Sequence, residues 1–136
     1  MCWMSSSAPV KRIAEKDRKV YKVLNVDAGG SIRSPYYVSM EWKLGEVFSS
    51  NIKMGYANDF GVTINEGLHS FSCAPDLERD FRGVIGVNKW VIGLSPKITH
   101  CDGDVVFECV IPKGSIYYEN EYGDIVSNKL KVIKKL

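Results

Sequence analysis

The chain lacks the features that mark several classes of protein. Its 136 residues contain no apolar run of the roughly 18 residues that a membrane span requires. The opening segment MCWMSSSAPVKR lacks the basic start and the apolar stretch of a signal peptide. A net charge of +2 does not indicate a surface for long nucleic acid. We therefore expect a cytosolic protein that binds neither membranes nor long nucleic acid.

Cysteine and histidine are scarce, and their spacing does not suit a metal site. The four cysteines include no C-x-x-C pair, and there are only two histidines. Cys109, within VVFECVI, has the surroundings of a small buried apolar residue. We expect reduced thiols, no metal and no other cofactor. The alternative is a metal site formed by His69, Cys73, His100 and Cys101.

The chain does contain enough apolar sequence for one folded domain. Apolar residues make up 45% of it and charged residues 25%, which is typical of globular proteins. We expect residues 20–136 to form this domain. Residues 1–19 are expected to form a tail, an extended N-terminal arm or a short helix, because VKRIAEKDRK has few apolar anchors.

Short apolar runs predict strands. KVYKVLNV, residues 19–26, is dense in β-branched and aromatic residues and stops at the turn signal DAGGS. DVVFECVI, residues 104–111, is the clearest strand, because alternate residues place four apolar side chains on one face. The segment SSNIKMGYANDFG, by contrast, has the composition of a loop.

The last segment, residues 125–136, predicts a strand at the edge of the sheet. Val126, Leu130 and Val132 are expected to point inward. Lys129 and Lys131 are expected to point outward and to protect an exposed edge.

One segment predicts a helix within the domain. In CAPDLERDF, Pro75 suits the first helical position, and the acidic residues 76 and 78 suit the positive end of a helix. We expect a helix over residues 75–81. The whole chain then has about six or seven short strands and one or two short helices. Since the strands come in runs, the expected class is α+β with a mainly antiparallel sheet.

Several expected strand ends bring a cationic side chain close to aromatic residues. RSPYY places Arg33 beside Tyr36, and DLERDFRG places Phe81 beside Arg82. NKW adds the amide of Asn88, and IPKGSIYY places Lys113 near two tyrosines. Such groups can hold phosphates and stack on bases, although each also suits a plain structural role. The chain has no G-x-S-x-G motif, so the pattern favours binding a small anionic, ring-bearing ligand over hydrolysing it.

His69, in GLHSFS, has three open interpretations: a structural, a ligand-contacting or a catalytic residue. If the segment is a strand, His69 shares a face with Phe71 and Ser70 points the other way. Ser70 is then badly placed as a nucleophile for His69, and Cys73 beyond the bend is the other candidate.

The order VYKVL, SPYY, EW-x-LGE, GLHSF, CVIPKGSIYY and IVSNKLKV, between residues 20 and 132, resembles that of small phage and prophage proteins. In size and β-rich character the chain is similar to phage anti-Thoeris "sponge" proteins. The resemblance implies a homo-oligomer in the cytoplasm of an infected bacterium. It also implies that the protein sequesters a cyclic ADP-ribose derivative or a cyclic oligonucleotide without cleaving it.

The same resemblance implies an aromatic residue and an asparagine around the sugar and base, with cationic residues around the phosphates. Our candidates for these roles are Phe81, Asn88, His69, Arg33 and Lys113. The Arg–aromatic groupings add Tyr36 and Arg82 to the expected ligand-binding set.

Two other functions remain open. One is a protein-binding inhibitor or a structural phage protein without a ligand. The other is an ADP-ribosyltransferase-like enzyme acting on a nucleotide-like substrate. The enzyme would use His69 with Tyr117 or Tyr118 and with Glu108 or Glu119, although His69 lies late in the chain for such a scheme.

Overall fold

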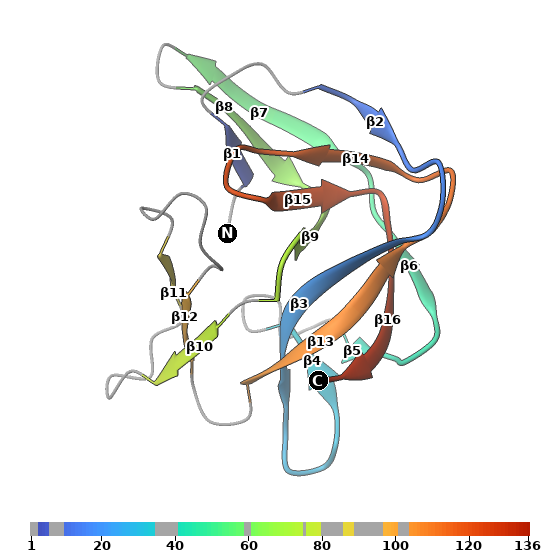
Figure 1. The fold of residues 1–136 in the computed structure, drawn as a ribbon, viewed down its shortest axis with the longest axis vertical. Helices are drawn as coiled ribbons and strands as arrows, with labels where there is room; N and C mark the ends of the chain where they lie inside the picture. Colours follow the sequence, from blue (N-terminus) through green and yellow to red (C-terminus); the bar gives the residue numbers. More distant parts are fainter. Residues whose placement is uncertain are drawn as a thin grey trace.

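The structure, a computed structural model, describes residues 3–5, 10–34, 41–58, 61–74, 76–79, 86–88, 97–100 and 104–136 (Figure 1). These ranges contain sixteen short strands and no helical residue. The expected α+β class with helices is therefore wrong, and the described part of the chain is all-β. No helix in these ranges is long and apolar enough to cross a membrane.

Ten strands form one large sheet in the order β2-β14-β15-β9-β3-β13-β16-β6, with β4 joined to β3 and β5 joined to β4. Its pairings are antiparallel, as the sequence predicts. The bounds of these strands are β2 Arg12–Ile13, β3 Arg18–Val26, β4 Ile32–Arg33, β5 Glu41–Trp42, β6 Val47–Ser49, β9 Leu68–Phe71, β13 Asp104–Ile111, β14 Ile116–Glu119, β15 Asp124–Ser127 and β16 Lys129–Lys135.

The pairing of β3 with β13 is the centre of this sheet, and it runs over eight residue pairs. Alternation places every second side chain of both strands on the inner face. Five of these side chains are at most 2% exposed: Val20, Leu24, Phe107, Cys109 and Ile111. The face that the sequence predicts for residues 104–111 is thus confirmed.

The large sheet closes on itself at Asn128, where the chain bends between β15 and β16 (Figure 1). The Asn128 N–H donates to the Ile116 carbonyl at 3.0 Å, and the Asn128 Oδ1 accepts the Ile116 N–H at 2.9 Å. The Asn128 carbonyl accepts the Ser50 N–H, also at 2.9 Å. These bonds bring β14, near one end of the sheet, to the chain that follows β6 at the other end. We call this curled sheet the barrel.

The barrel encloses the main core. Its buried residues are Ala14, Val20, Leu24, Trp42, Leu68, Phe107, Cys109, Ile111, Ile125, Leu130 and Val132. Val126 is also fully buried, but it packs with Ile64 in a second cluster on the outer face of β15. Leu130 and Val132 point inward, as the sequence predicts. The inward direction expected for Val126 is wrong, because the chain bends at Asn128 and β15 is a separate strand from β16.

The expected edge position of the last segment is wrong. In the described sheet β16 lies between β13 and β6, so its lysines do not protect an edge. Lys129 is exposed and Lys131 is half-buried. Alternation within one strand shows which side chains point outward, but it carries no information about the neighbours that the strand acquires.

A second sheet covers part of the outer face of the barrel, in the order β1-β8-β7. Its strands are β1 Trp3–Ser5, β7 Lys53–Asn58 and β8 Gly61–Glu66. The expectation of a loop over β7 is wrong, because pairing with β8 supplies partners that a Gly- and Asn-rich segment lacks by itself. Gly67 then leads directly from β8 into β9 with φ 147°, and a Cβ there would collide with Val126.

The third sheet replaces the expected helix at residues 75–81. Over the described residues 76–79 the chain forms strand β10, Asp76–Arg79, which pairs in parallel with β12, Lys97–His100. Strand β11, Gly86–Asn88, pairs antiparallel with β12. A helix of seven residues is barely stable alone, and β12 offers the backbone partners that decide the outcome.

Two local expectations concern the chain on either side of β3. In DAGGS, the Asp27 Oδ1 accepts the N–H groups of Gly29 and Ser31, both at 2.9 Å, so the predicted turn is confirmed. Before β3, the short strand β2 pairs with β14, and this corresponds to the extended alternative for the N-terminal arm.

Candidate functional site

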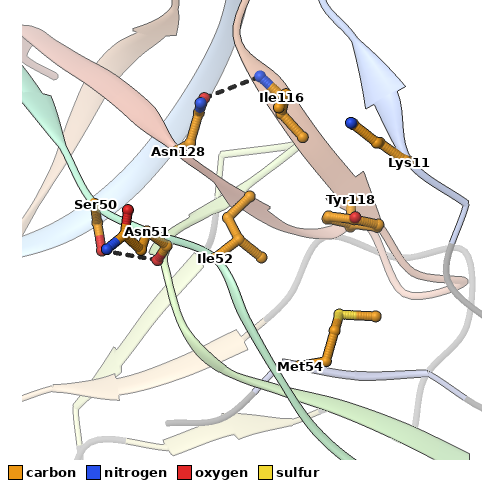
Figure 2. Close-up of a pocket in the computed structure, with 8 residues that line it drawn as sticks. All are labelled: Lys11, Ser50, Asn51, Ile52, Met54, Ile116, Tyr118 and Asn128. Carbon is orange, nitrogen blue, oxygen red and sulfur yellow. Dashed lines mark hydrogen bonds between the residues drawn. The ribbon is translucent and has the colours of Figure 1, made fainter.

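An open hollow of about 290 Å³ lies on the outer surface beside β14, where the barrel closes (Figure 2). Three segments bring its walls together: the arm before β2, the link from β6 with the start of β7, and strand β14 with the bend at Asn128. Its lining residues are Lys11, Ser50, Asn51, Ile52, Met54, Ile116, Tyr118 and Asn128.

The floor of the hollow is apolar and well supported. Ile52 and Tyr118 both pack against the fully buried pair Ile64 and Val126. Since Tyr118 lies opposite Val126 in the β14–β15 register, this support fixes the side to which its ring points. Figure 2 shows the Tyr118 ring between Lys11 and Met54, so an entering ring system would meet an aromatic side chain held from below.

The rim of the hollow is polar, and closure of the barrel fixes part of it. Because the Asn128 Oδ1 accepts the Ile116 N–H, the amide has one orientation and its NH₂ group is the end that can donate to a ligand. The Ser50 hydroxyl donates to the Asn51 carbonyl at 3.1 Å. Lys11, on the exposed arm, supplies a positive charge. The hollow thus offers an aromatic face, amides and one cation.

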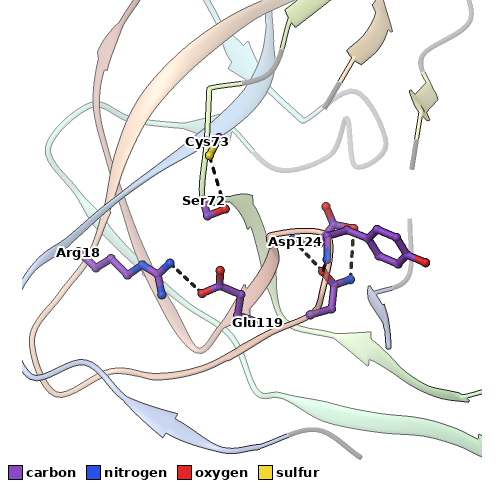
Figure 3. A network of polar contacts seen from close by, with 7 residues as sticks. Arg18, Ser72, Cys73, Glu119 and Asp124 are labelled. Atoms are coloured by element: carbon purple, nitrogen blue, oxygen red, sulfur yellow. Dashed lines mark hydrogen bonds and ion pairs between the residues drawn. The ribbon is translucent and has the colours of Figure 1, made fainter. Parts of the chain in front are cut away.

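A separate polar network holds the opposite face of β14 (Figure 3). Arg18 forms an ion pair with Glu119 at 2.8 Å, and its guanidinium lies 5.2 Å from the centre of the Tyr117 ring. Burial by itself would lower the pKa of Arg18, but the hydrogen bonds and charge interactions with Glu119 and, after it, Tyr117 together raise that pKa. Tyr117 and Tyr118 therefore have different environments although they are adjacent in sequence.

The turn after β14 is also held by polar groups. The Asn120 Oδ1 accepts the N–H of Tyr122 at 3.0 Å and that of Asp124 at 2.9 Å. Such an arrangement replaces backbone partners within a tight turn, so it is structural. It fixes the spacing between β14 and β15, and with it the position of Tyr118.

The carboxylates of the enzyme hypothesis already have cationic partners. Glu119 binds Arg18, and Glu108 binds Lys19 at 3.3 Å. His69, Val126 and Tyr118 lie in one row across β9, β15 and β14, which places His69 about 10 Å from Tyr118 between Cα atoms. The buried side chain of Val126 stands between them.

The predicted ligand-binding residues are spread over the chain. Arg33 lies opposite Asn25 near the end of β3, whereas Lys113 follows β13 near the start of β3. The nine residues of β3 separate these two positions by about 25 Å, so one small ligand cannot contact both within a single chain. His69 is half-buried on the outer face of β9, and Asn88 ends β11 opposite Lys97. Tyr36, Phe81 and Arg82 lie outside the described residues.

Sequence reasoning missed most of the hollow. Of the lining residues, Ile116 and Tyr118 lie in IPKGSIYY, and Tyr118 belongs to the aromatic pair that the sequence singles out there. Lys11 and Asn51 come from segments with no periodic pattern, and Asn128 looks like an ordinary polar residue within a strand. They come together only because the barrel closes. Lys11 and Ser50, for example, are 39 positions apart in the chain.

The described cysteines differ in their surroundings. Burial raises the pKa of the Cys109 thiol to about 12, so this residue is a neutral apolar side chain, as expected. Cys73 is exposed, and its sulfur lies 4.0 Å from the Ser72 hydroxyl (Figure 3). The described residues contain no group of three metal-ligating side chains, and Cys101 lies outside them.

Comparison with known proteins adds no relative to this description. No family model matches the chain, and no curated protein and no solved structure matches it either.

Proposed function

We propose that the protein binds a small anionic, nucleotide-derived ligand in the hollow and releases it unchanged. The observation that supports this is the combination of the supported Tyr118 ring, the Lys11 ammonium and the amides of Asn51 and Asn128 around one space. An aromatic face can stack on a base, and a cation can hold a phosphate. The resemblance to phage sponge proteins favours a cyclic ADP-ribose derivative or a cyclic oligonucleotide as the ligand.

The proposed assembly is a homo-oligomer in the cytoplasm of an infected bacterium. A hollow of about 290 Å³ is at the small end of ligand sites, which span about 300–1,000 Å³. One subunit then encloses a base and one phosphate, and a second subunit covers the rest of the ligand. This arrangement would let residues such as Arg33 or Lys113 of another copy contribute to the same site.

The test begins with a thermal shift against ADP-ribose derivatives and cyclic di- and trinucleotides, followed by heat denaturation and chromatography of the released ligand. A shift with intact ligand recovered supports the proposal. Lys11→Ala should reduce the shift, and Lys16→Ala, which removes another exposed lysine of the same arm, should leave it unchanged. Recovery of a converted ligand would identify an enzyme instead.

A protein partner is the second candidate, and exposed apolar side chains support it. Val10 is 68% exposed, Ile13 61% and Met54 51%. Val10 and Ile13 flank Lys11 in the arm, and Met54 lines the hollow. Isolated apolar residues on a surface are common, so the grouping around one hollow is what favours a contact. If no nucleotide shifts the melting temperature but a partner protein does, this second function replaces the first.

A further inference from the structure

Lys22 is a cationic residue on the inner face of the barrel. It lies between Val20 and Leu24 on β3, and these two neighbours on the same face are fully buried. Its ammonium lies 5.5 Å from the centre of the Trp42 ring and donates to the His69 carbonyl at 2.7 Å. The side chain is half-buried. A charge placed in such a setting needs compensation, because moving an ion away from water is costly.

The Lys22 side chain bonds across the boundary between β3 and β9. These strands share a single residue pair, Tyr21 with Phe71. Two residues before Phe71 on β9, the His69 carbonyl accepts a hydrogen bond from the Lys22 ammonium and not from a backbone N–H of β3. A side-chain hydrogen bond from Lys22 therefore takes the place of a backbone bond at this boundary.

No described carboxylate compensates this charge. The described ion pairs join Arg18 to Glu119 and Lys19 to Glu108. The one titratable side chain from β13 that influences Lys22 on the inner face is Cys109, and burial keeps its thiol neutral by raising its pKa to about 12. The His69 ring points to the outer face, as does Glu41 on β5 beside Trp42.

Two buried polar groups near Lys22 have no hydrogen-bond partner within the part of the chain that the structure describes. They are the Trp42 Nε1 and the Ser70 hydroxyl, and each residue is 3% exposed. Ser70 follows the carbonyl that binds Lys22, and the Trp42 ring faces the ammonium. Covalent geometry keeps both polar atoms within about 8 Å of the Lys22 nitrogen. All three groups can donate a hydrogen bond, and buried donors without acceptors are rare.

We propose that the Lys22 ammonium, the Ser70 hydroxyl and the Trp42 indole N–H form a binding site for a small carboxylate-sized anion inside the barrel. An oxyanion provides the acceptors that these donors lack and the negative charge that the interior cation lacks. The site is distinct from the hollow, because none of its residues lines that space. It is therefore independent of the proposed function.

The protonation of Lys22 gives the site a predictable pH dependence. Burial lowers the pKa of Lys22 to about 8, so at pH 7 the ammonium is mostly charged and at pH 9.5 the amine is mostly neutral. If only the charged form binds an anion, the apparent affinity should fall about 30-fold over this interval, in proportion to the charged fraction.

Nuclear magnetic resonance of the tryptophan side chains tests this site. The chain has three tryptophans, so the Trp42 indole signal can be assigned with Trp42→Phe. Sodium formate, exchanged for sodium chloride at constant ionic strength, should shift this signal in a saturable way at pH 7. The apparent dissociation constant from this titration should be about 30-fold higher at pH 9.5.

Matched variants separate the site from general salt effects. Lys22→Met should abolish the shift and Ser70→Ala should weaken binding several-fold, whereas Lys19→Met, which removes an exposed lysine of the same strand, should change nothing. Since Ser70→Ala is a small change, it serves if Lys22→Met fails to fold. A Trp42 signal that does not move with formate, or that moves equally in Lys22→Met, would refute the site.

Discussion

Lys11 and Lys22 lie in opposite environments within this small protein. Lys11 is exposed at the rim of the hollow, where water solvates its charge and its neighbours decide what it can bind. Lys22 lies on the inner face of the barrel, where loss of water lowers its pKa to about 8. A lysine on the surface keeps its hydration and can move to contact a ligand. A lysine in the interior loses hydration, so its charged form is destabilised. The interior and the surface of the barrel should therefore respond differently to substitution.

The largest expected effect is on the interior. Phe107 is 2% exposed and belongs to the main core. Phe107→Ala should lower the free energy of unfolding by about 3–5 kcal/mol, because it removes buried apolar surface and leaves a cavity. Met54→Ala, on the surface of the hollow, should cost less than about 0.5 kcal/mol. Urea unfolding of both variants measures the contrast, and equal losses would contradict the described core.

The second effect concerns the titration of Lys22. Its pKa is about 8 in the folded chain and 10.5 in the reference state, so between these pH values the unfolded chain binds the additional proton. Stability should therefore rise with pH across this window, by at most about 3 kcal/mol. Lys22→Met should lose this rise and should be more stable than the wild type at pH 7. Unfolding curves at pH 7, 9 and 10 measure the difference, and parallel pH profiles would show that Lys22 is well solvated.

A smaller effect is expected at the closure of the barrel. Asn128→Ala removes the side-chain acceptor of the Ile116 N–H and leaves that donor unpaired. The expected loss is about 1–3 kcal/mol. Asn51→Ala, a second asparagine of the hollow that is exposed, should be close to neutral. If the two variants unfold at the same urea concentration, the closing bonds are not as described.

The smallest effect belongs to the half-buried ion pair of β14. A double-mutant cycle with Arg18→Met and Glu119→Gln should give a coupling energy of about 1 kcal/mol, because water still reaches both side chains. The coupling should decrease in high salt. A coupling of several kcal/mol would place the pair in a drier site than its exposure indicates.

The sequence predicts local features of the fold better than its connections. The strand at residues 104–111, its buried face and the DAGGS turn follow from alternation and turn chemistry, which act over a few residues. The strand at residues 76–79 could not be predicted in this way, because its partner β12 lies about twenty positions later. The edge position expected for the last segment fails for the same reason, since β6 pairs with it from far away in the chain.

The candidate site shows the same limit. Tyr118 is visible in the sequence as part of an aromatic pair, but only the register of β14 with β15 shows that Tyr117 and Tyr118 face opposite sides. Lys11 and Asn128 reach the hollow through the closure of the barrel. The predicted pair Arg33 and Lys113 has suitable chemistry, yet β3 holds the two residues apart. Chemistry is readable in the sequence, whereas proximity depends on long-range pairing.

The most direct test of the proposed function is a calorimetric titration with the nucleotide that gives the largest thermal shift. Wild type and Tyr122→Leu, which changes an exposed tyrosine outside the hollow, should bind with equal affinity. Tyr118→Leu should bind about 5- to 150-fold more weakly, the equivalent of losing about 1–3 kcal/mol of stacking. Unchanged affinity in Tyr118→Leu would contradict the claim that the hollow is the binding site.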